Sequence, residues 1–127
     1  MIQGIGVDIV EVERIRSAME RWGAAFIEKV FTEGEIQYCT AKKNPHEHFA
    51  ARFAAKEAVS KALAIGWSGG FRWKDVEILN EPTGRPQVKL YEHVNELLAG
   101  SHVFLSLSHT ATAVIAFAVI ERSDGRA

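Results

Sequence analysis

Charged and aromatic side chains recur at every fourth position in one alanine-rich segment, PHEHFAARFAAKEAVSKALA, residues 45–64. The segment has no internal glycine or proline, so it is expected to form a helix that ends before the glycine that follows. Side chains four apart lie on one face of a helix, where aromatic residues would face the interior or a cleft and charged ones its edge. These residues are Phe49, Phe53, Glu57 and Lys61.

Two interpretations of Glu57 and Lys61 are open at this point. An exposed Glu–Lys pair one helical turn apart stabilises a helix by only about 0.2–0.5 kcal/mol and needs no function. The neighbouring stripe favours a binding role, because Arg52, Lys56 and Ser60 would gather phosphate-binding groups on the same side. The helix therefore offers either a surface ion pair or the edge of a phosphate site.

A single carboxylate, Asp8, interrupts the apolar segment IQGIGVDIV, residues 2–10. Burying a carboxylate without a partner is costly, so Asp8 is expected at the end of a strand or beside a cation. It could cap a helix that begins near Val12, or pair with a nearby arginine. Together with Glu57 it would instead form a two-carboxylate site for a hard divalent cation, and magnesium commonly binds one or two carboxylates plus water and phosphate oxygens.

Two turns carry further polar candidates. His109 and Thr110 lie in SLSHTAT between two apolar segments, where a histidine is either solvated or a donor to phosphate oxygens. Residues 80–86, NEPTGRP, have the composition of a turn whose backbone is fixed by Gly84 and Pro86.

Several other kinds of site are disfavoured. Cys39, His46 and His48 lack a fourth ligand and a recognised zinc spacing. The chain has no GxxxxGK[ST] loop, and the glycine-rich GWSGG at residues 66–70 is too loose to replace one. A G-x-S-x-G nucleophile motif is also missing. Structural zinc, P-loop chemistry and serine-hydrolase chemistry are therefore poor explanations of this sequence.

Composition sets broad limits on the protein. The 127 residues fit one domain, residues 1–127, and 47% hydrophobic residues suffice for a core. The net charge of -1 gives no global basic field for a nucleic acid or a membrane surface. With one cysteine, no secretory signal pattern and no apolar run long enough to span a bilayer, the chain is expected to be soluble and cytoplasmic.

Charge is concentrated locally on the helix expected after the first strand. Arg14 and Arg21 are seven residues apart and would share one face of that helix. They form either a solvated face or a docking surface for an acidic partner.

The order of elements predicts an α+β fold, with a mostly antiparallel sheet packed against a long helix and shorter helices. The last strand, AVIAFAVI, is apolar on both faces, so it should be central in the sheet or covered by another subunit. Strands are expected at residues 2–10, 73–79, 87–90, 102–108 and 113–121, and helices near residues 12–22, 24–31, 32–43, 45–64 and 91–100.

Four segments, in this order and spacing, resemble the bacterial holo-acyl-carrier-protein synthases over nearly the whole chain. They are GIGVDIVEVERI at 4–15, FAARFAAKEAVSKALAIG at 49–66, NEPTGRPQV at 80–88 and LSLSHTATAVIAFAVI at 105–120. The resemblance implies transfer of the 4'-phosphopantetheine arm of coenzyme A to a serine of an acyl carrier protein in fatty acid biosynthesis. It also implies release of adenosine 3',5'-bisphosphate, and a homotrimer with active sites between subunits.

The resemblance also implies roles for individual residues. Asp8 and Glu57 match the family's magnesium ligands, and Lys61 matches a lysine near the pyrophosphate that stabilises or protonates the departing phosphate. A water on the metal, or Glu57 itself, would take the serine proton, and the sequence does not decide between them.

Further positions match the family's substrate contacts. Arg52 and His109, with Thr110 beside it, resemble contacts to the nucleotide phosphates, and His109 would come from a neighbouring subunit. Gly84 and Pro86 resemble the turn against the adenine.

The basic helix face and two departures from the pattern complete the comparison. Arg14 and Arg21 resemble the face that docks the acidic carrier. The basic group before the long helix is diluted by His46-Glu47-His48, and the sequence suggests no role for Trp67 or Trp73.

Two other functions remain compatible with these residues. One is a coenzyme A or nucleotide-binding module without catalysis. The other is a magnesium-dependent phosphotransferase with a different pantetheine donor or a different acceptor serine.

Overall fold

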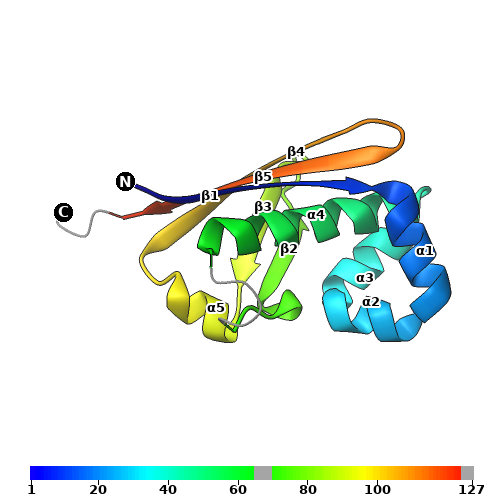
Figure 1. The fold of residues 1–127 in the computed structure, drawn as a ribbon, viewed down its shortest axis with the longest axis horizontal. Helices are drawn as coiled ribbons and strands as arrows, with labels where there is room; N and C mark the ends of the chain where they lie inside the picture. Colours follow the sequence, from blue (N-terminus) through cyan, green and yellow to red (C-terminus); the bar gives the residue numbers. More distant parts are fainter. Residues whose placement is uncertain (65–69, 124–127) are drawn as a thin grey trace.

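The computed structural model describes residues 1–64 and 70–123, and these form the α+β arrangement that the sequence predicts (Figure 1). Three antiparallel strands lie in the order β1-β5-β4, and β2 pairs with β3 in a separate antiparallel ribbon. The elements are β1 (Ile2–Glu11), α1 (Val12–Trp22), α2 (Ala24–Val30), α3 (Glu33–Thr40), α4 (Pro45–Leu63), the 3-10 helix η1 (Trp73–Asp75), β2 (Val76–Asn80), β3 (Pro86–Leu90), α5 (Glu92–Leu97), β4 (Ser101–His109) and β5 (Ala113–Arg122).

Two predicted boundaries are wrong, for local reasons. Residues 73–79 do not form one strand, because the amide of Asp75 donates to the carbonyl of Arg72 and closes a 3-10 turn before β2. Helix α3 ends at Thr40, whose hydroxyl donates back to the carbonyl of Ile36. Most of the expected glycine-rich loop, with Trp67, falls in residues 65–69 and lies outside the described residues.

Strand β1 and helix α4 touch backbone to backbone, which explains the two glycines of the strand. A Cβ atom at Gly4 would lie 1.9 Å from the carbonyl oxygen of Ala62, and one at Gly6 would lie 2.0 Å from that of Ala58. No larger residue fits at either position without moving the helix. The contact sets Asp8, two residues beyond Gly6, against the last turns of α4.

The core lies between α4 and the inner face of the three-stranded sheet. Strand β5 is central, as its sequence predicts, and its inward residues Val114, Ala116, Ala118 and Ile120 are all buried. Small residues on this face let α4 approach closely. On its other side α4 packs against the cluster of α1, α2 and α3 through Phe49.

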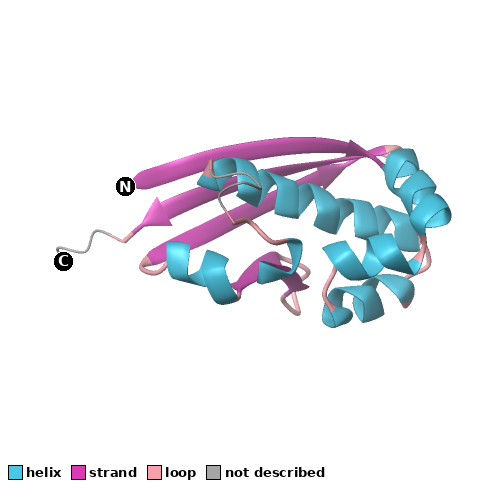
Figure 2. Cartoon of the chain, turned by 60° about the horizontal axis from the view of Figure 1, so that its bottom comes forward, coloured by secondary structure: helices cyan, strands magenta, loops and turns pink. Residues whose placement is uncertain are grey.

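The outer face of the same sheet is apolar and uncovered. All helices lie on one side of the three strands, as Figures 1 and 2 show. The opposite side, called the apolar face here, exposes between 42% and 61% of each of Ile5, Val7, Ile9, Phe104, Ile115 and Phe117. None of the described helices has the length and hydropathy needed to cross a bilayer.

Candidate active site

Asp8 forms an ion pair with Lys61 across the contact between β1 and α4. The Lys61 Nζ lies 3.0 Å from Asp8 Oδ1 and 3.2 Å from the carbonyl oxygen of Val7. The expected cation beside Asp8 is therefore Lys61. Asp8 does not cap α1, whose N-cap residue is Glu11 and has no side-chain cap. The side chain of Lys61 stays 54% exposed, so the pair opens to solvent.

Glu57 lies half-buried one turn before Lys61, close enough to Asp8 for their charges to interact. Burial raises the pKa of Glu57, the charge of Asp8 raises it further, and Lys61 and Arg14 oppose the shift. Two carboxylates that disfavour each other's charge suit a cation between them. In residues 1–64 and 70–123 no cluster of three or more metal-ligating side chains occurs. The donor set itself, two carboxylates, fits magnesium, which commonly takes one or two carboxylates from the protein.

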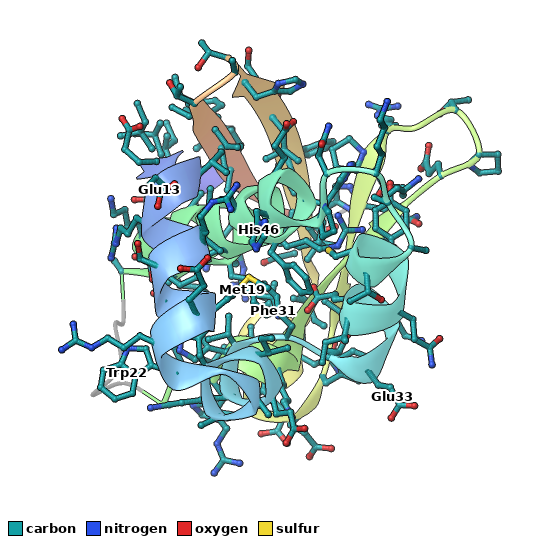
Figure 3. The ribbon with its side chains drawn as sticks, turned by 90° about the vertical axis from the view of Figure 1, so that its right-hand side faces the viewer. Glu13, Met19, Trp22, Phe31, Glu33 and His46 are labelled. Atoms are coloured by element: carbon teal, nitrogen blue, oxygen red, sulfur yellow. The ribbon has the colours of Figure 1, made fainter. Side chains whose placement is uncertain are left out.

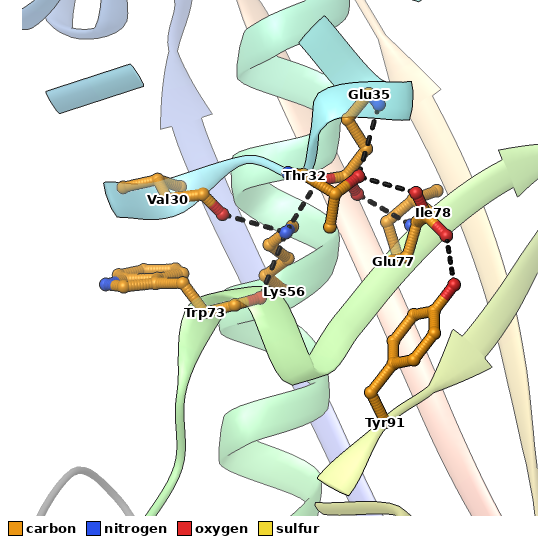
Figure 4. Close-up of polar contacts among 8 residues, drawn as sticks. All are labelled: Val30, Thr32, Glu35, Lys56, Trp73, Glu77, Ile78 and Tyr91. Atoms are coloured by element: carbon orange, nitrogen blue, oxygen red, sulfur yellow. Dashed lines mark hydrogen bonds and ion pairs between the residues drawn. The ribbon is translucent and has the colours of Figure 1, made fainter. Parts of the chain in front are cut away.

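The neighbouring stripe of α4 does not gather phosphate-binding groups as predicted. Lys56 is 0% exposed and donates to Glu35 and to two backbone carbonyls, those of Val30 and Trp73 (Figure 4). Its ammonium has no donor left for a ligand. The expectation for Lys56 is therefore wrong, because the helix turns this position into the protein.

Arg52, one turn before Lys56, is also buried but is only partly satisfied. It is 4% exposed, and its Nη2 donates to Asn80 Oδ1 over 2.7 Å. Asn80 in turn donates to the carbonyl of Gly84 over 3.0 Å, which ties the β2–β3 turn to α4. The guanidinium lies 4.1 Å from the ring centre of Tyr38. Its Nε is buried without a hydrogen-bond partner, which is an uncommon state for a buried donor.

Further basic side chains lie near Arg52. The basic cluster is defined here as Lys42, His48, Arg52 and His109. Lys42 lies 4.5 Å from the Tyr38 ring centre, and the His48 ring packs edge-on against that ring. The pKa of His48 is lowered by burial, by Arg52 and Lys42, and more weakly by His109. An anion bound here would relieve this repulsion. Sequence reasoning missed both neighbours of Arg52. His48 lies four residues before Arg52 on α4, so helical spacing could have found it, whereas only folding brings Tyr38 of α3 to Arg52.

The hairpin residues lie at the edge of this cluster. His109 is exposed at the end of β4, and its Nδ1 lies 3.4 Å from the carbonyl oxygen of Thr110. The Thr110 hydroxyl accepts from the amides of Thr112 and Ala113, so it closes the turn. Gly84 has a φ of 93°, which favours glycine, and Pro86 begins β3.

A pocket of about 820 Å³ adjoins Glu57 on the other side of α4. Phe53 and Trp73 stack with ring centres 5.0 Å apart, and Phe71 meets Trp73 edge-on. The sequence suggested no role for Trp73, which here forms a wall. The pocket is lined by Arg14, Lys29, Phe53, Glu57, Phe71, Arg72, Trp73, Lys74 and Asp75, so its aromatic interior has a predominantly basic surround.

The basic face of α1 continues from this pocket. Arg14 lies 5.7 Å from the ring centre of Phe53. Arg21 lies 5.3 Å from the ring centre of Trp22, which is 60% exposed. Figure 3 shows Trp22 at the outside of the molecule. The face therefore combines two arginines with an exposed aromatic ring.

Comparison with known proteins identifies the class. Residues 4–118 match the family described as the 4'-phosphopantetheinyl transferase superfamily. The chain belongs to this family.

Individual proteins and solved structures within this family are similar to the chain over nearly its whole length. A protein of Geobacter sp. (strain M21) named holo-[acyl-carrier-protein] synthase is 44% identical over 96% of this chain and all of its own length. The fold is also similar to two crystal structures of such synthases. The Bacillus anthracis structure, in complex with CoA (3',5'-ADP), has a TM-score of 0.80 at 35% identity and covers 97% of this chain and 99% of that chain. The Helicobacter pylori structure, in complex with coenzyme A, has a TM-score of 0.82 at 32% identity and covers 92% and 99%.

Proposed function

We propose that the protein transfers the 4'-phosphopantetheine group of coenzyme A to a serine hydroxyl of apo acyl carrier protein and releases adenosine 3',5'-bisphosphate. The observation that carries this is the position of Asp8, Glu57 and Lys61. They lie where β1 meets α4, with the basic cluster and the aromatic pocket also built on α4. A donor and an acceptor can therefore approach from different directions.

Asp8 and Glu57 would hold a magnesium ion against the pyrophosphate of coenzyme A. When bound, the ion would neutralise phosphate charge and make the phosphorus more electrophilic. The ammonium of Lys61 donates two of its three protons, to Asp8 and to the carbonyl of Val7. Its third proton is available to stabilise the departing phosphate. Either Glu57 or a water beside it would accept the serine proton.

The basic cluster would bind the nucleotide end of the donor. Arg52 has an unused buried Nε, and the positive charges of Arg52 and Lys42, which lower the pKa of His48 together with burial, would favour a bound anion. His109 stands exposed at the edge of the cluster, where it can contact phosphate, with Thr110 beside it shaping the turn. Gly84 and Pro86 would lie against the adenine, since Asn80 links their turn to Arg52.

The aromatic pocket and the basic face of α1 would receive the carrier. Carrier proteins are acidic, and Arg14 and Arg21 present positive charge on a chain whose net charge is only -1. Arg14 lies between this face and the pocket beside Glu57. A carrier docked on α1 could therefore bring its serine to the carboxylates.

We also propose that the protein acts in the cytoplasm as a homotrimer joined through the apolar face. Six large apolar side chains there are about half exposed, which is a large patch for a monomer. Sedimentation of wild type and Ile115→Lys tests this, with trimer expected for the first and monomer for the second. A stable wild-type monomer at micromolar concentration would contradict it.

The decisive assay weighs the carrier. The protein is incubated with coenzyme A, magnesium and apo carrier, and a gain of one phosphopantetheine arm is expected. No gain would overturn the proposal. Coenzyme A binding without transfer, unaffected by a chelator, would instead favour a binding module.

A further inference from the structure

The wholly enclosed Lys56 connects four elements. Its Nζ lies 2.7 Å from Glu35 Oε1 on α3, 2.8 Å from the carbonyl oxygen of Val30 at the end of α2, and 3.0 Å from that of Trp73 in η1. Figure 4 shows these three contacts converging on the one ammonium. An ammonium has three protons, so α4 uses all of them to hold three neighbouring segments.

Two of these segments, α2 and η1, also form walls of the pocket beside Glu57. Lys29 precedes Val30 and lines the pocket, and Trp73 lines it directly. Phe53 and Glu57, which line it from α4, lie one turn before Lys56 and immediately after it. Lys56 therefore stands behind the pocket and contacts the backbone of its walls.

Stability alone is a poor explanation for a charge at this position. An apolar side chain of similar volume could cover the same space, and replacing a whole buried ion pair by apolar residues is often neutral or stabilising. An apolar side chain could not donate to the carbonyls of Val30 and Trp73, which would then lose their partner on α4. The ammonium of Lys56 thus fixes the orientation of two backbone carbonyls, those of Val30 and Trp73.

We propose that Lys56 is a positioning residue for the acceptor reaction, an inference that rests on the proposed function. By holding the carbonyl of Trp73, it keeps the Trp73 ring stacked on Phe53 and the pocket preformed for the carrier. Lys56 itself touches neither substrate. The donor side has separate support, because Glu35 Oε2 accepts from the amide of Ile78 over 2.7 Å, and Ile78 lies on β2 near Asn80.

The variant Lys56→Met distinguishes an effect on the acceptor side, which binds the carrier, from one on the donor side, which binds coenzyme A. The variant removes the bonds to Val30 and Trp73 and the ion pair to Glu35, but it leaves the bonds of Glu35 to the amides of Thr32 and Ile78. We expect kcat/KM for the carrier to fall about 10–100-fold while KM for coenzyme A stays within about twofold. Steady-state transfer with each substrate varied in turn, well below the melting temperature, measures both. An unchanged kcat/KM for the carrier, or an equal loss on both substrates, would overturn the inference.

Further variants distinguish a positioning role from a general loss of rigidity. Tyr91→Phe removes a 2.7 Å bond to Glu77 at the outer end of the same network, and it should lower stability without changing either KM. Trp73→Phe combined with Lys56→Met should be non-additive for the carrier if Lys56 acts through Trp73; additive effects would count against it. Should Lys56→Met not fold, Lys56→Arg keeps a donor and should lower carrier kcat/KM less than Trp73→Ala, with an unchanged value contradicting the inference.

Failure of the inference is distinct from failure of the function. A wild-type protein that transfers nothing overturns the proposed function. A wild type that is active, with carrier kinetics in Lys56→Met that are normal, overturns only the role of Lys56.

Discussion

Helix α4 carries two lysines five residues apart, and each pairs with a carboxylate from another element. The Lys56–Glu35 pair is 0% exposed on both sides with a separation of 2.7 Å. The Lys61–Asp8 pair has a similar separation of 3.0 Å, but its side chains are 54% and 13% exposed. Local geometry is thus nearly the same, and the surroundings differ.

The difference lies in what each pair has left to offer. Glu35 accepts from the amides of Thr32 and Ile78 in addition to Lys56, so the closed pair is saturated. In the open pair, one donor of Lys61 and the second carboxylate oxygen of Asp8 stay available to a ligand. Glu57, whose pKa is raised by burial and by the charge of Asp8, lies beside them. We therefore expect a chemical role for the Lys61–Asp8 pair, whose hydrogen-bonding capacity is incomplete. For the Lys56–Glu35 pair we expect a structural role.

The largest expected effect is on activity at the open pair. Asp8→Asn keeps the shape of the side chain but removes the charge that a divalent ion needs. We expect transfer to fall roughly a thousandfold, with the free energy of unfolding changed by less than about 1 kcal/mol. Carrier mass analysis over time gives the rate and urea denaturation gives the stability. Near-normal transfer at ordinary magnesium would remove Asp8 from the site.

The second effect is on stability. Here the larger loss is expected at the closed pair, whereas the larger loss of activity is expected at the open pair. Lys56→Met leaves Glu35 as a buried carboxylate without its cation, so we expect a loss of about 3–5 kcal/mol in unfolding free energy. Lys61→Met should cost less than about 1 kcal/mol, because its pair is open to solvent. Both are measured by urea unfolding at one protein concentration, since a trimer would make stability depend on it. Equal losses would mean that burial does not distinguish the pairs.

The sequence predicted the open pair better than the closed one. Asp8 is a charge in an apolar strand, so it was expected at the end of the strand or beside a cation, and the structure places it beside Lys61. Lys56 could not be told from a surface lysine, because its stripe on α4 also carries Arg52 and Ser60. Which side of a helix is enclosed depends on α2, α3 and η1, whose packing no local pattern encodes.

Local sequence patterns predicted the fold but did not predict the aromatic pocket. Apolar segments on either side of the turn at His109 and Thr110 predicted the strands β4 and β5, and an alanine-rich segment without internal glycine or proline predicted α4. The aromatic wall depends on Trp73, which local sequence placed in a strand and the structure places in a 3-10 turn. Tyr38 joins Arg52 only because α3 folds back on α4, whereas His48 lies one turn before Arg52 on α4 itself.

The third effect is the response of stability to magnesium. An ion held by Asp8 and Glu57 binds only the folded chain, so it should raise unfolding free energy by about 2.7 kcal/mol at a hundred times its dissociation constant. The melting temperature of wild type should rise with magnesium and return with a chelator. Glu57→Gln should show little rise, and Lys56→Met should keep it. A full rise in Glu57→Gln would place the ion elsewhere.

The smallest effect concerns acid stability at the edge of the closed pair. Burial raises the pKa of Glu77, but bonds from the hydroxyls of Thr32 and Tyr91 outweigh it, so the folded pKa lies below the ordinary 4.5. A lowered carboxyl pKa contributes stability above 4.5 that is lost as the pH falls through the folded value. Tyr91→Phe should therefore cost about 1–2 kcal/mol near neutral pH, and the difference from wild type should shrink below 4.5.

Urea unfolding from neutral pH to pH 3 measures this convergence, with Tyr38→Phe as a matched loss of a tyrosine hydroxyl outside the network. Tyr38 has ring contacts to Arg52 and Lys42 rather than a bond to Glu77, so its difference from wild type should not converge in that window. A constant gap between Tyr91→Phe and wild type would show that Glu77 is not held by Tyr91. The saturated network would then end at Thr32, and the contrast with the open pair would rest on Glu35 and Lys56 alone.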